Sequence, residues 1–290
     1  MAFTSPATSF VPGDTNNAND VFVRDVGAGT TSRVSVGPGG QEAGAASTGS
    51  GLSGNGRFVV FWSAAANVVA GDTNVAIDVF VHDRLQGETT RESVGPGGAE
   101  ANGRSFTAFV NAGTPVRGTP LSGVISSDGR FLVFQSAATN LVPNDANGVF
   151  DAFIRDRQEG TTDLVSVADD GTRGNGSSTG PFVSDDGRIV SFTSNATNLV
   201  PGDTNGVLDV FVRDLQEGTT TRVSRAVDGG HTNGFSIVVT MSNDGRYVVY
   251  RSNATNVVPD DTNGTQDLFV HDRETGETQR LVGAAGEQPN

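Results

Sequence analysis

The stretch SDDGRIVSFTSNATNLVPGDTNGVLDVFVRDLQEGTTTRVS, residues 184–224, contains the pattern on which the chain is built. Its apolar and β-branched runs IVSF, DVFV and TRVS are separated by turn-forming Gly, Asp and Asn residues. The Asp-Gly pair in SDDGR favours a tight hairpin, so a further strand is expected before it. Because the runs show no helical period, the pattern predicts a unit of four antiparallel strands.

This unit recurs along the chain. A GDTN-like segment places an aspartate at intervals of 58, 73, 58 and 58 residues, at Asp14, Asp72, Asp145, Asp203 and Asp261. The long interval is one period with 15 extra residues, which fall near Phe106 to Pro120. Such self-similarity indicates a repeat protein. We expect one domain, 1–290, with units near 1–48, 49–121, 122–179, 180–237 and 238–290.

The first unit is incomplete. Residues 3–14 align with residues 192–203, so the chain starts inside the second strand of this unit and lacks the first strand and the SxDGR turn. The copies therefore amount to slightly under five blades. Closing a ring would need terminal pairing, an imperfect blade or another chain, and an open edge strand invites association with a second copy.

The second strands are apolar on both faces, as in the run FVVF at residues 58–61. A strand with one wet face would alternate, so these strands are expected to lie between two layers. Sheets arranged around an axis bury both faces of every sheet, which predicts an all-β β-propeller of about five four-stranded blades. A straight β-solenoid is the alternative architecture, although its coils are usually shorter.

The motifs SxDGRxVxF and DVFVRD resemble the repeat of the bacterial TolB-type, WD40-like propeller family, and the resemblance covers nearly the whole chain. It implies a propeller fold in a secreted, periplasmic or cell-surface bacterial protein. Members of that family serve as periplasmic assembly factors, surface proteins and enzyme-associated domains, so the resemblance selects no single activity. This chain departs from the family by its long insert between the second and third strands.

The charge balance restricts the partners. With 19 basic and 33 acidic residues the net charge is −14, which repels phosphate backbones and argues against nucleic acid. No apolar stretch approaches the length of a membrane helix, so no membrane insertion is expected. The chain has no Cys, which excludes disulfides and thiolate metal sites. An acidic chain suits bound cations where its carboxylates have ligand spacing.

Such spacing is present in every unit as Asp-x-Asn-x-x-x-Asp. These candidate ligands are Asp14, Asn16, Asp20, Asp72, Asn74, Asp78, Asp145, Asn147, Asp151, Asp203, Asn205, Asp209, Asp261, Asn263 and Asp267. Oxygen ligands at alternating positions, followed by a bend and a later carboxylate, are typical of calcium loops. The irregular oxygen set suits Ca²⁺ better than Mg²⁺, so we expect about one structural Ca²⁺ per repeat.

In the fourth unit Asp203, Asn205 and Asp209 would fill the third, fifth and ninth places of such a loop, with Gly206 at the bend. The arrangement is similar to the calcium loops of the integrin α-chain propeller. Pro201 stands at the first place, which leaves that ligand unmatched. The alternative is a plain Asp-Thr-Asn-Gly turn, but a turn needs no distant Asp209 at the mouth of a strand, where Asp is disfavoured without a partner.

Motifs that look catalytic lack their structural context. A GxSxG match at residues 176–180 and a GxGxxG match at residues 49–54 lie between expected strands, without the helix that either motif requires. His82 and His271 take a position held elsewhere by Arg and are expected at solvated strand ends, and His231 is expected in a loop. Glu42 and Glu100 are one period apart and belong to the repeat rather than to an acid pair.

Together these features predict a calcium-binding propeller that acts as a binding scaffold or self-assembling surface module. Its ligand would be a protein or a glycan, and a homo-oligomer could form through the incomplete terminal blade. The alternative function is a carbohydrate-active or other hydrolase with its site in the axial funnel, where acids from several blades converge. Trp62 is the one aromatic residue that such a sugar site could use, because the Phe residues recur at core positions.

Overall fold

The computed structural model describes residues 1–108 and 123–282, which fold into five antiparallel sheets in chain order, here called blades 1 to 5. Blade 1 contains β1 (Ala2–Ser5), β2 (Asp20–Asp25) and β3 (Thr30–Arg33). Blade 2 contains β4 (Ser47–Leu52), β5 (Phe58–Ser63), β6 (Asp78–Asp83) and β7 (Glu88–Arg91). Blade 3 contains β8 (Ser105–Phe106), β9 (Phe131–Ser136), β10 (Asp151–Asp156) and β11 (Thr161–Leu164). Blade 4 contains β12 (Ser178–Val183), β13 (Ile189–Ser194), β14 (Asp209–Asp214) and β15 (Thr219–Arg222). Blade 5 contains β16 (Ser236–Met241), β17 (Tyr247–Ser252), β18 (Asp267–Asp272) and β19 (Thr278–Arg280).

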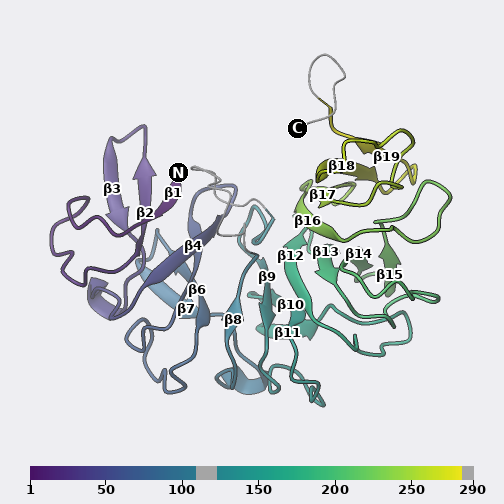
Figure 1. Ribbon diagram of the computed structural model, residues 1–290. Coiled ribbons are helices and arrows are strands. Elements are labelled where there is room, and N and C mark those ends of the chain that lie inside the picture. Colours follow the sequence, from purple (N-terminus) through teal and green to yellow (C-terminus); the bar gives the residue numbers. More distant parts are fainter. Residues whose placement is uncertain (109–122, 283–290) are drawn as a thin grey trace.

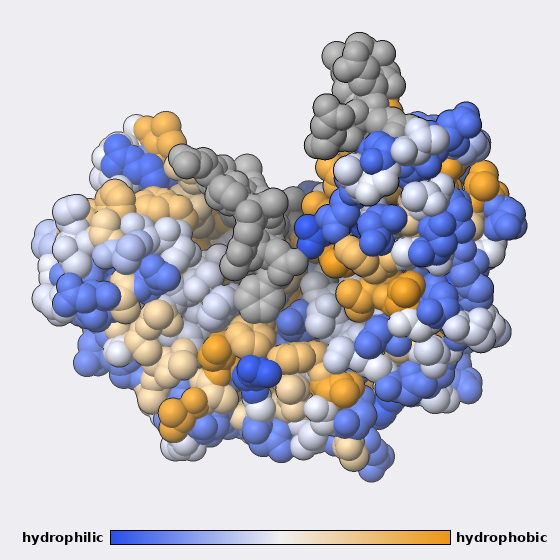
Figure 2. All heavy atoms as spheres, in the orientation of Figure 1, coloured by the Kyte–Doolittle hydropathy of each residue, from blue (hydrophilic) through white to orange (hydrophobic). Residues whose placement is uncertain are grey.

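The blades follow one another around an open arc, in which blade 1 and blade 5 stand on either side of a gap (Figure 1). This arrangement confirms the predicted propeller architecture. Blade 1 has three strands, with β1 at its edge, so its first strand is missing as the alignment predicted. Figure 2 shows hydrophilic residues along much of the outer rim and hydrophobic residues on the blades that border the gap.

Helical structure in the described residues is limited to two short 3₁₀ turns, η1 (Pro38–Gly40) and η2 (Pro96–Gly98). No helix in the described part of the chain is long and apolar enough to cross a membrane. The predicted insertion near Phe106 to Pro120 lies largely outside the described residues. Phe106 itself ends β8. Beyond the insertion, Ile125 forms an isolated antiparallel bridge with Leu132 of β9.

The SxDGR turns join each first strand to the second strand and also connect neighbouring blades. In blade 4 the Ser184 hydroxyl and the Arg188 N–H both donate to Asp186 Oδ1, at 2.5 and 3.0 Å. Gly187 adopts φ 75°, a left-handed conformation that favours glycine. A Cβ atom on Gly187 would lie 2.5 Å from the ring of Phe131 in blade 3. The glycine is therefore required both by the turn and by the close approach of the next blade.

The hydrophobic core lies between the blades. We call the side of a blade that contacts the next blade its forward face, and the opposite side its backward face. Val21 and Val23 of β2, on the forward face of blade 1, form one buried cluster with Val59, Phe61 and Phe80 on the backward face of blade 2. Phe61 and Phe80 are fully buried and stack with ring centroids 5.5 Å apart. Burial of both faces explains why the second strands do not alternate.

Hydrogen bonds also cross the junctions between blades. At three of the four junctions, a main-chain N–H of a first strand donates to a side chain near the end of the second strand of the preceding blade. The pairs are Gly49 to Thr4 Oγ1 at 2.9 Å, Gly180 to Gln135 Oε1 at 2.7 Å and Val238 to Thr193 Oγ1 at 3.0 Å. Blade 2 has Trp62 at the equivalent position. A junction thus combines apolar packing with a directional contact that sets its register.

Candidate metal-binding loops

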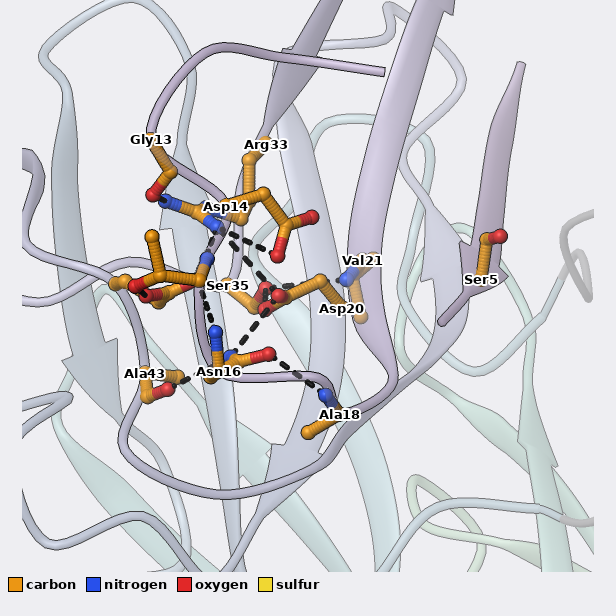
Figure 3. Close-up of polar contacts among 12 residues, drawn as sticks. Ser5, Gly13, Asp14, Asn16, Ala18, Asp20, Val21, Arg33, Ser35 and Ala43 are labelled. Carbon is orange, nitrogen blue, oxygen red and sulfur yellow. Dashed lines mark hydrogen bonds and ion pairs between the residues drawn. The ribbon is translucent and has the colours of Figure 1, made fainter. Parts of the chain in front are cut away.

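The GDTN-like segment of each unit forms the loop between the second and third strands. In blade 1 the predicted ligands Asp14 and Asn16 lie in this loop, and Asp20 begins β2. Their side chains point toward one another and toward Arg33 at the end of β3 (Figure 3). Asn17 has φ 52° at the place of the glycine found in the fourth unit, a left-handed conformation that Asn tolerates. The fold therefore brings together the residues that the spacing selects.

The asparagine of the Asp-x-Asn-x-x-x-Asp motif forms hydrogen bonds within the loop. Asn16 Nδ2 donates to Asp20 Oδ2 at 3.1 Å, and Asn16 Oδ1 accepts from the Ala18 N–H at 2.8 Å. Asp20 is fully buried and also accepts a 2.5 Å hydrogen bond from the Ser35 hydroxyl. The same Asn-to-Asp contact recurs as Asn74–Asp78, Asn147–Asp151, Asn205–Asp209 and Asn263–Asp267, at 2.7 to 3.1 Å. The asparagine oxygen thus serves the turn, and the second aspartate of each loop is held rigidly.

An arginine lies against each aspartate pair. In blade 1, Arg33 Nη1 is 3.6 Å from Asp14 Oδ1, 3.5 Å from Asp20 Oδ2 and 2.7 Å from Glu42 Oε1. The corresponding arginines in blades 2, 4 and 5 are Arg91, Arg222 and Arg280. In blade 3 Leu164 takes this place, and Arg173 from the segment after β11 lies against Asp145 instead. The sequence analysis did not connect these residues with the loops. The signal was present, because an arginine recurs in the TRVS-like segments of four units.

Blades 1 and 2 add a third carboxylate to the pair. Oxygen atoms of Asp14, Asp20 and Glu42 lie within 4.8 Å of one another, and blade 2 repeats the set as Asp72, Asp78 and Glu100. Within the described residues these are the two groups of three acidic or histidine side chains with such spacing.

The other blades change this position. Blade 3 has Arg173 at the place of Glu42, and blade 4 has His231, whose Nδ1 lies 2.9 Å from Arg222. The loops therefore differ in charge although their aspartates recur.

The first aspartate of most loops has an unsatisfied oxygen. The side chain of Asp14 is only 2% exposed, yet its Oδ1 atom has no hydrogen bond. The same holds for Oδ1 of Asp72, Asp145 and Asp261. Their guanidinium neighbours lie at 3.5, 3.8 and 3.3 Å without forming a hydrogen bond of good geometry. Because buried carboxylate oxygens are normally paired, these atoms fit an oxygen-ligated cation such as Ca²⁺.

The electrostatics of blade 2 show the excess of negative charge. Burial and then repulsion from Asp78 raise the pKa of Asp72 to about 6, although Arg91 opposes the shift. Burial also acts to raise the pKa of Glu100, but hydrogen bonds from Thr73 and the Arg91 guanidinium outweigh it and lower that pKa to about 2. Asp72 is therefore the carboxyl of this group whose ionisation is disfavoured most, because three acids surround a single arginine.

Each third strand ends with a further aspartate that forms a turn, and four of these five aspartates also pair with an arginine: Asp25, Asp83, Asp156, Asp214 and Asp272. Asp83 Oδ1 accepts from the Leu85 N–H, and both Asp83 oxygens accept from Arg57 at 2.9 and 2.6 Å.

The expectation of a solvated His82 is wrong. His82 is 6% exposed, because it lies at the junction between blades 1 and 2 and bonds to Thr89, whose hydroxyl donates to the Val36 carbonyl of blade 1. Burial lowers the pKa of His82, so this histidine is a neutral junction residue.

Side chains of the kinds that catalytic and sugar-binding sites use have structural partners in this fold. Glu92 is 5% exposed and pairs with Arg157 at 2.9 Å and Arg155 at 3.5 Å, which links blade 2 to blade 3. Trp62 packs edge-to-face on Phe106 with ring centroids 5.4 Å apart. The GxSxG match at residues 176–180 enters β12, and the GxGxxG match at residues 49–54 lies in and after β4, so neither precedes a helix in the described structure.

No protein-family model matches the sequence, and no curated protein matches it. Solved structures match the fold. A TolB-like protein from Agrobacterium tumefaciens superposes with a TM-score of 0.50 and 15% identity, covering 91% of this chain and 73% of its own. An oligogalacturonate lyase in complex with manganese has a TM-score of 0.51 and 14% identity, with 91% of this chain and 59% of the lyase covered.

The tricorn protease has a TM-score of 0.50 and 11% identity over 92% of this chain. This chain spans only 24% of the protease and less than two thirds of the lyase. At these identities the comparisons show the fold alone, a β-propeller, as the sequence pattern predicted. The same architecture carries proteins with different activities, so the chemistry of the loops has to be judged from this chain's own residues.

Proposed function

We propose that this protein is a binding scaffold whose loops between second and third strands hold structural Ca²⁺. The observation that carries the calcium part is the buried Oδ1 atom of the first aspartate, which has no hydrogen bond at Asp14, Asp72, Asp145 and Asp261. Ca²⁺ accepts carboxylate and carbonyl oxygens in flexible geometry, which suits a loop with an irregular backbone and one carboxylate oxygen that receives no hydrogen bond.

The charge of each loop sets the order of affinity. In blades 1 and 2 three carboxylates face one guanidinium, which leaves a net charge near −2 within a few ångströms. In blades 3 and 5 two aspartates face one guanidinium, and in blade 4 His231 also lies against Arg222. Calcium affinity rises with the number of charged ligands, so the loops of blades 1 and 2 are the strongest candidates.

Arg91 competes with the ion for the same oxygens. Its Nη1 atom lies 3.5 Å from Asp72 and 3.7 Å from Asp78, beyond good hydrogen-bond distance, but only 2.6 Å from Glu100. A bound Ca²⁺ would therefore displace weak contacts of Arg91 and leave its strong contact with Glu100 available. Removal of the guanidinium should raise calcium affinity.

Calcium would act on stability rather than on chemistry. An ion that binds the folded loop but not the unfolded chain stabilises the fold by mass action. The propeller faces would then serve as a rigid surface for a protein or glycan ligand. Weak calcium loops are used by extracellular modules, where the ion is abundant, which agrees with a secreted, periplasmic or cell-surface location.

Thermal unfolding tests the proposal in Ca²⁺, in Mg²⁺ and in a chelator at matched ionic strength. We expect Ca²⁺ alone to raise the melting temperature of the wild type, and to raise that of Arg91→Gln by a larger increment. Arg57→Gln is the matched control, because Arg57 pairs with Asp83 outside the loop and its loss should leave the calcium increment unchanged. Equal melting temperatures in all three buffers for the wild type and Arg91→Gln would reduce the loops to plain turns.

A further inference from the structure

The third carboxylate of each acid cluster comes from the segment that connects one blade to the next. In blade 1, Glu42 lies between β3 and β4, and its carboxylate accepts from the Thr15 N–H and from the Thr15 hydroxyl, both at 2.8 Å. Asn16 Nδ2 donates to the neighbouring carbonyl of Ala43 at 3.0 Å (Figure 3). One side of this segment is therefore held by the metal-binding loop of its own blade.

The other side of the segment is held by an asparagine of the following blade. Asn67 lies in the loop between β5 and β6 of blade 2, five residues before Asp72. Its Nδ2 donates to the Glu42 carbonyl at 2.8 Å, and its Oδ1 accepts from the Gly44 N–H at 2.7 Å. These two contacts fix the main chain that carries Glu42. They come from the loop that also carries the candidate metal ligands of blade 2.

The same asparagine clamp recurs at the next three junctions. In each of them the asparagine Nδ2 donates to a carbonyl of the connecting segment, and the asparagine Oδ1 accepts a main-chain N–H from two residues further on. The pairs joined through Nδ2 are Asn140 with Glu100, Asn198 with Arg173 and Asn256 with His231, at 2.7 to 2.9 Å. The clamp therefore belongs to the repeat, whereas the residue that it holds is an acid only at the junctions after blades 1 and 2.

A glycine allows the two acid-bearing segments to lie directly against the clamping loop. A Cβ atom on Gly37 would lie 2.1 Å from the main-chain oxygen of Asn67, and one on Gly95 would lie 2.3 Å from that of Asn140. No side-chain rotation could relieve these contacts, because the clashing atoms belong to the main chain. The segments that carry arginine and histidine have Ala168 and Ala226 at this place. The acid clusters thus coincide with the two junctions at which the approach requires glycine.

We propose that each acid cluster is a cation site completed across a blade junction, in which Asn67 positions Glu42 and Asn140 positions Glu100. The asparagine acts through the main chain of the glutamate and does not contact the ion. Because the loop that clamps one cluster carries the aspartates of the next, a bound cation would tighten the junctions that follow blades 1 and 2. The inference rests on the proposed function and adds the residues that position its ligands.

Calcium titration calorimetry of variants at Asn67 tests this role. All variants are made in an Asp72→Asn background, which leaves blade 1 as the one loop in the described chain with three clustered carboxylates. Asn67→Ala should weaken the tightest calcium site by about tenfold or more, because loss of a residue that orients a metal ligand typically has this effect. Glu42→Ala should also weaken it. The double variant should bind no more weakly than Glu42→Ala alone, because no carboxylate is left to position.

Asn198→Ala is the matched control, since it removes the same clamp from a segment that carries Arg173 instead of an acid. Its melting temperature in chelator should fall, but its tightest calcium site should keep the affinity of the background. Unchanged affinity in Asn67→Ala, an equal loss in Asn198→Ala or additive losses in the double variant would each overturn the inference and leave the calcium proposal intact. No calcium uptake by the background would also overturn it, and none by the wild type either would overturn the proposed function with it. Far-UV circular dichroism establishes that each variant is folded.

Discussion

Asp72 is the residue at which fold stability and cation binding oppose each other. Its side chain is 2% exposed, close to Asp78 and Glu100, and one of its oxygens has no hydrogen bond. In the absence of a cation a neutral residue would be tolerated better at this position. A carboxylate there is destabilising unless a positive charge reaches it, and Arg91 provides this only in part.

The pH dependence of stability should reveal this opposition. Because the pKa of Asp72 is raised to about 6, the folded protein holds this proton more tightly than the unfolded chain does. A raised pKa contributes stability that is complete below the unfolded pKa and is lost as the pH rises through about 6. In chelator at pH 7, Asp72→Asn should therefore be more stable than the wild type by about 1 kcal/mol, a value reduced by solvent screening.

This advantage should shrink as the pH falls from 7 toward 4, and added Ca²⁺ at pH 7 should reverse it. Urea unfolding at a series of pH values measures both effects. Asp163→Asn, on the exposed part of β11, is the control and should follow the wild-type curve. Parallel curves for Asp72→Asn and the wild type would contradict the assignment of the strain to Asp72.

At the scale of single elements, the SxDGR turn determines both hairpin and junction, and substitution separates the two roles. Gly187 lies in this turn, whereas Gly202 lies in the loop between β13 and β14. Both have a left-handed backbone, with φ 75° and 73°. A Cβ atom at Gly187 would meet the ring of Phe131 at 2.5 Å, whereas one at Gly202 would meet nothing within 4 Å. Gly202→Ala should lower the unfolding free energy by about 1 kcal/mol through backbone strain alone. Gly187→Ala should lower it by about 2 to 4 kcal/mol, because overpacking of the junction is added.

Urea unfolding of the two variants checks this difference. Equal losses at Gly187 and Gly202 would mean that Phe131 moves aside freely and that the junction is loosely packed. A larger loss at Gly202 would contradict the role of the turn in blade packing.

The elements themselves were largely predictable from the sequence. The runs at residues 58–61 and 189–192 are apolar on both faces, and this feature alone placed them between two sheets, where β5 and β13 lie. The loop clusters were only half predictable. Spacing brought Asp14 and Asp20 together, because both belong to one local loop.

Spacing could not show Arg33 or Glu42, which reach the same point from β3 and from the segment after it. Their proximity depends on how the hairpin returns across the blade, and a linear motif does not contain that information. The same limit applies to His82. Its position at a strand end suggested solvent, but contact with blade 1 buries it.

At the scale of the whole molecule, a repeat array gains stability from each blade and from each junction between neighbours. Blades 2, 3 and 4 have junctions on both faces, whereas blade 5 has one on its backward face only among the described residues. Its third strand, β18, has nearly the same sequence as β14 in blade 4, DLFVHD against DVFVRD. Intrinsic strand propensity is therefore matched, and any difference in local stability between these two strands comes from the missing junction.

Amide hydrogen exchange should show this difference directly. In dilute protein the amides of β18 should exchange at least tenfold faster than those of β14, because opening of blade 5 disrupts fewer contacts. Equal protection of β18 and β14 in dilute protein would mean that the missing junction causes no loss of local stability.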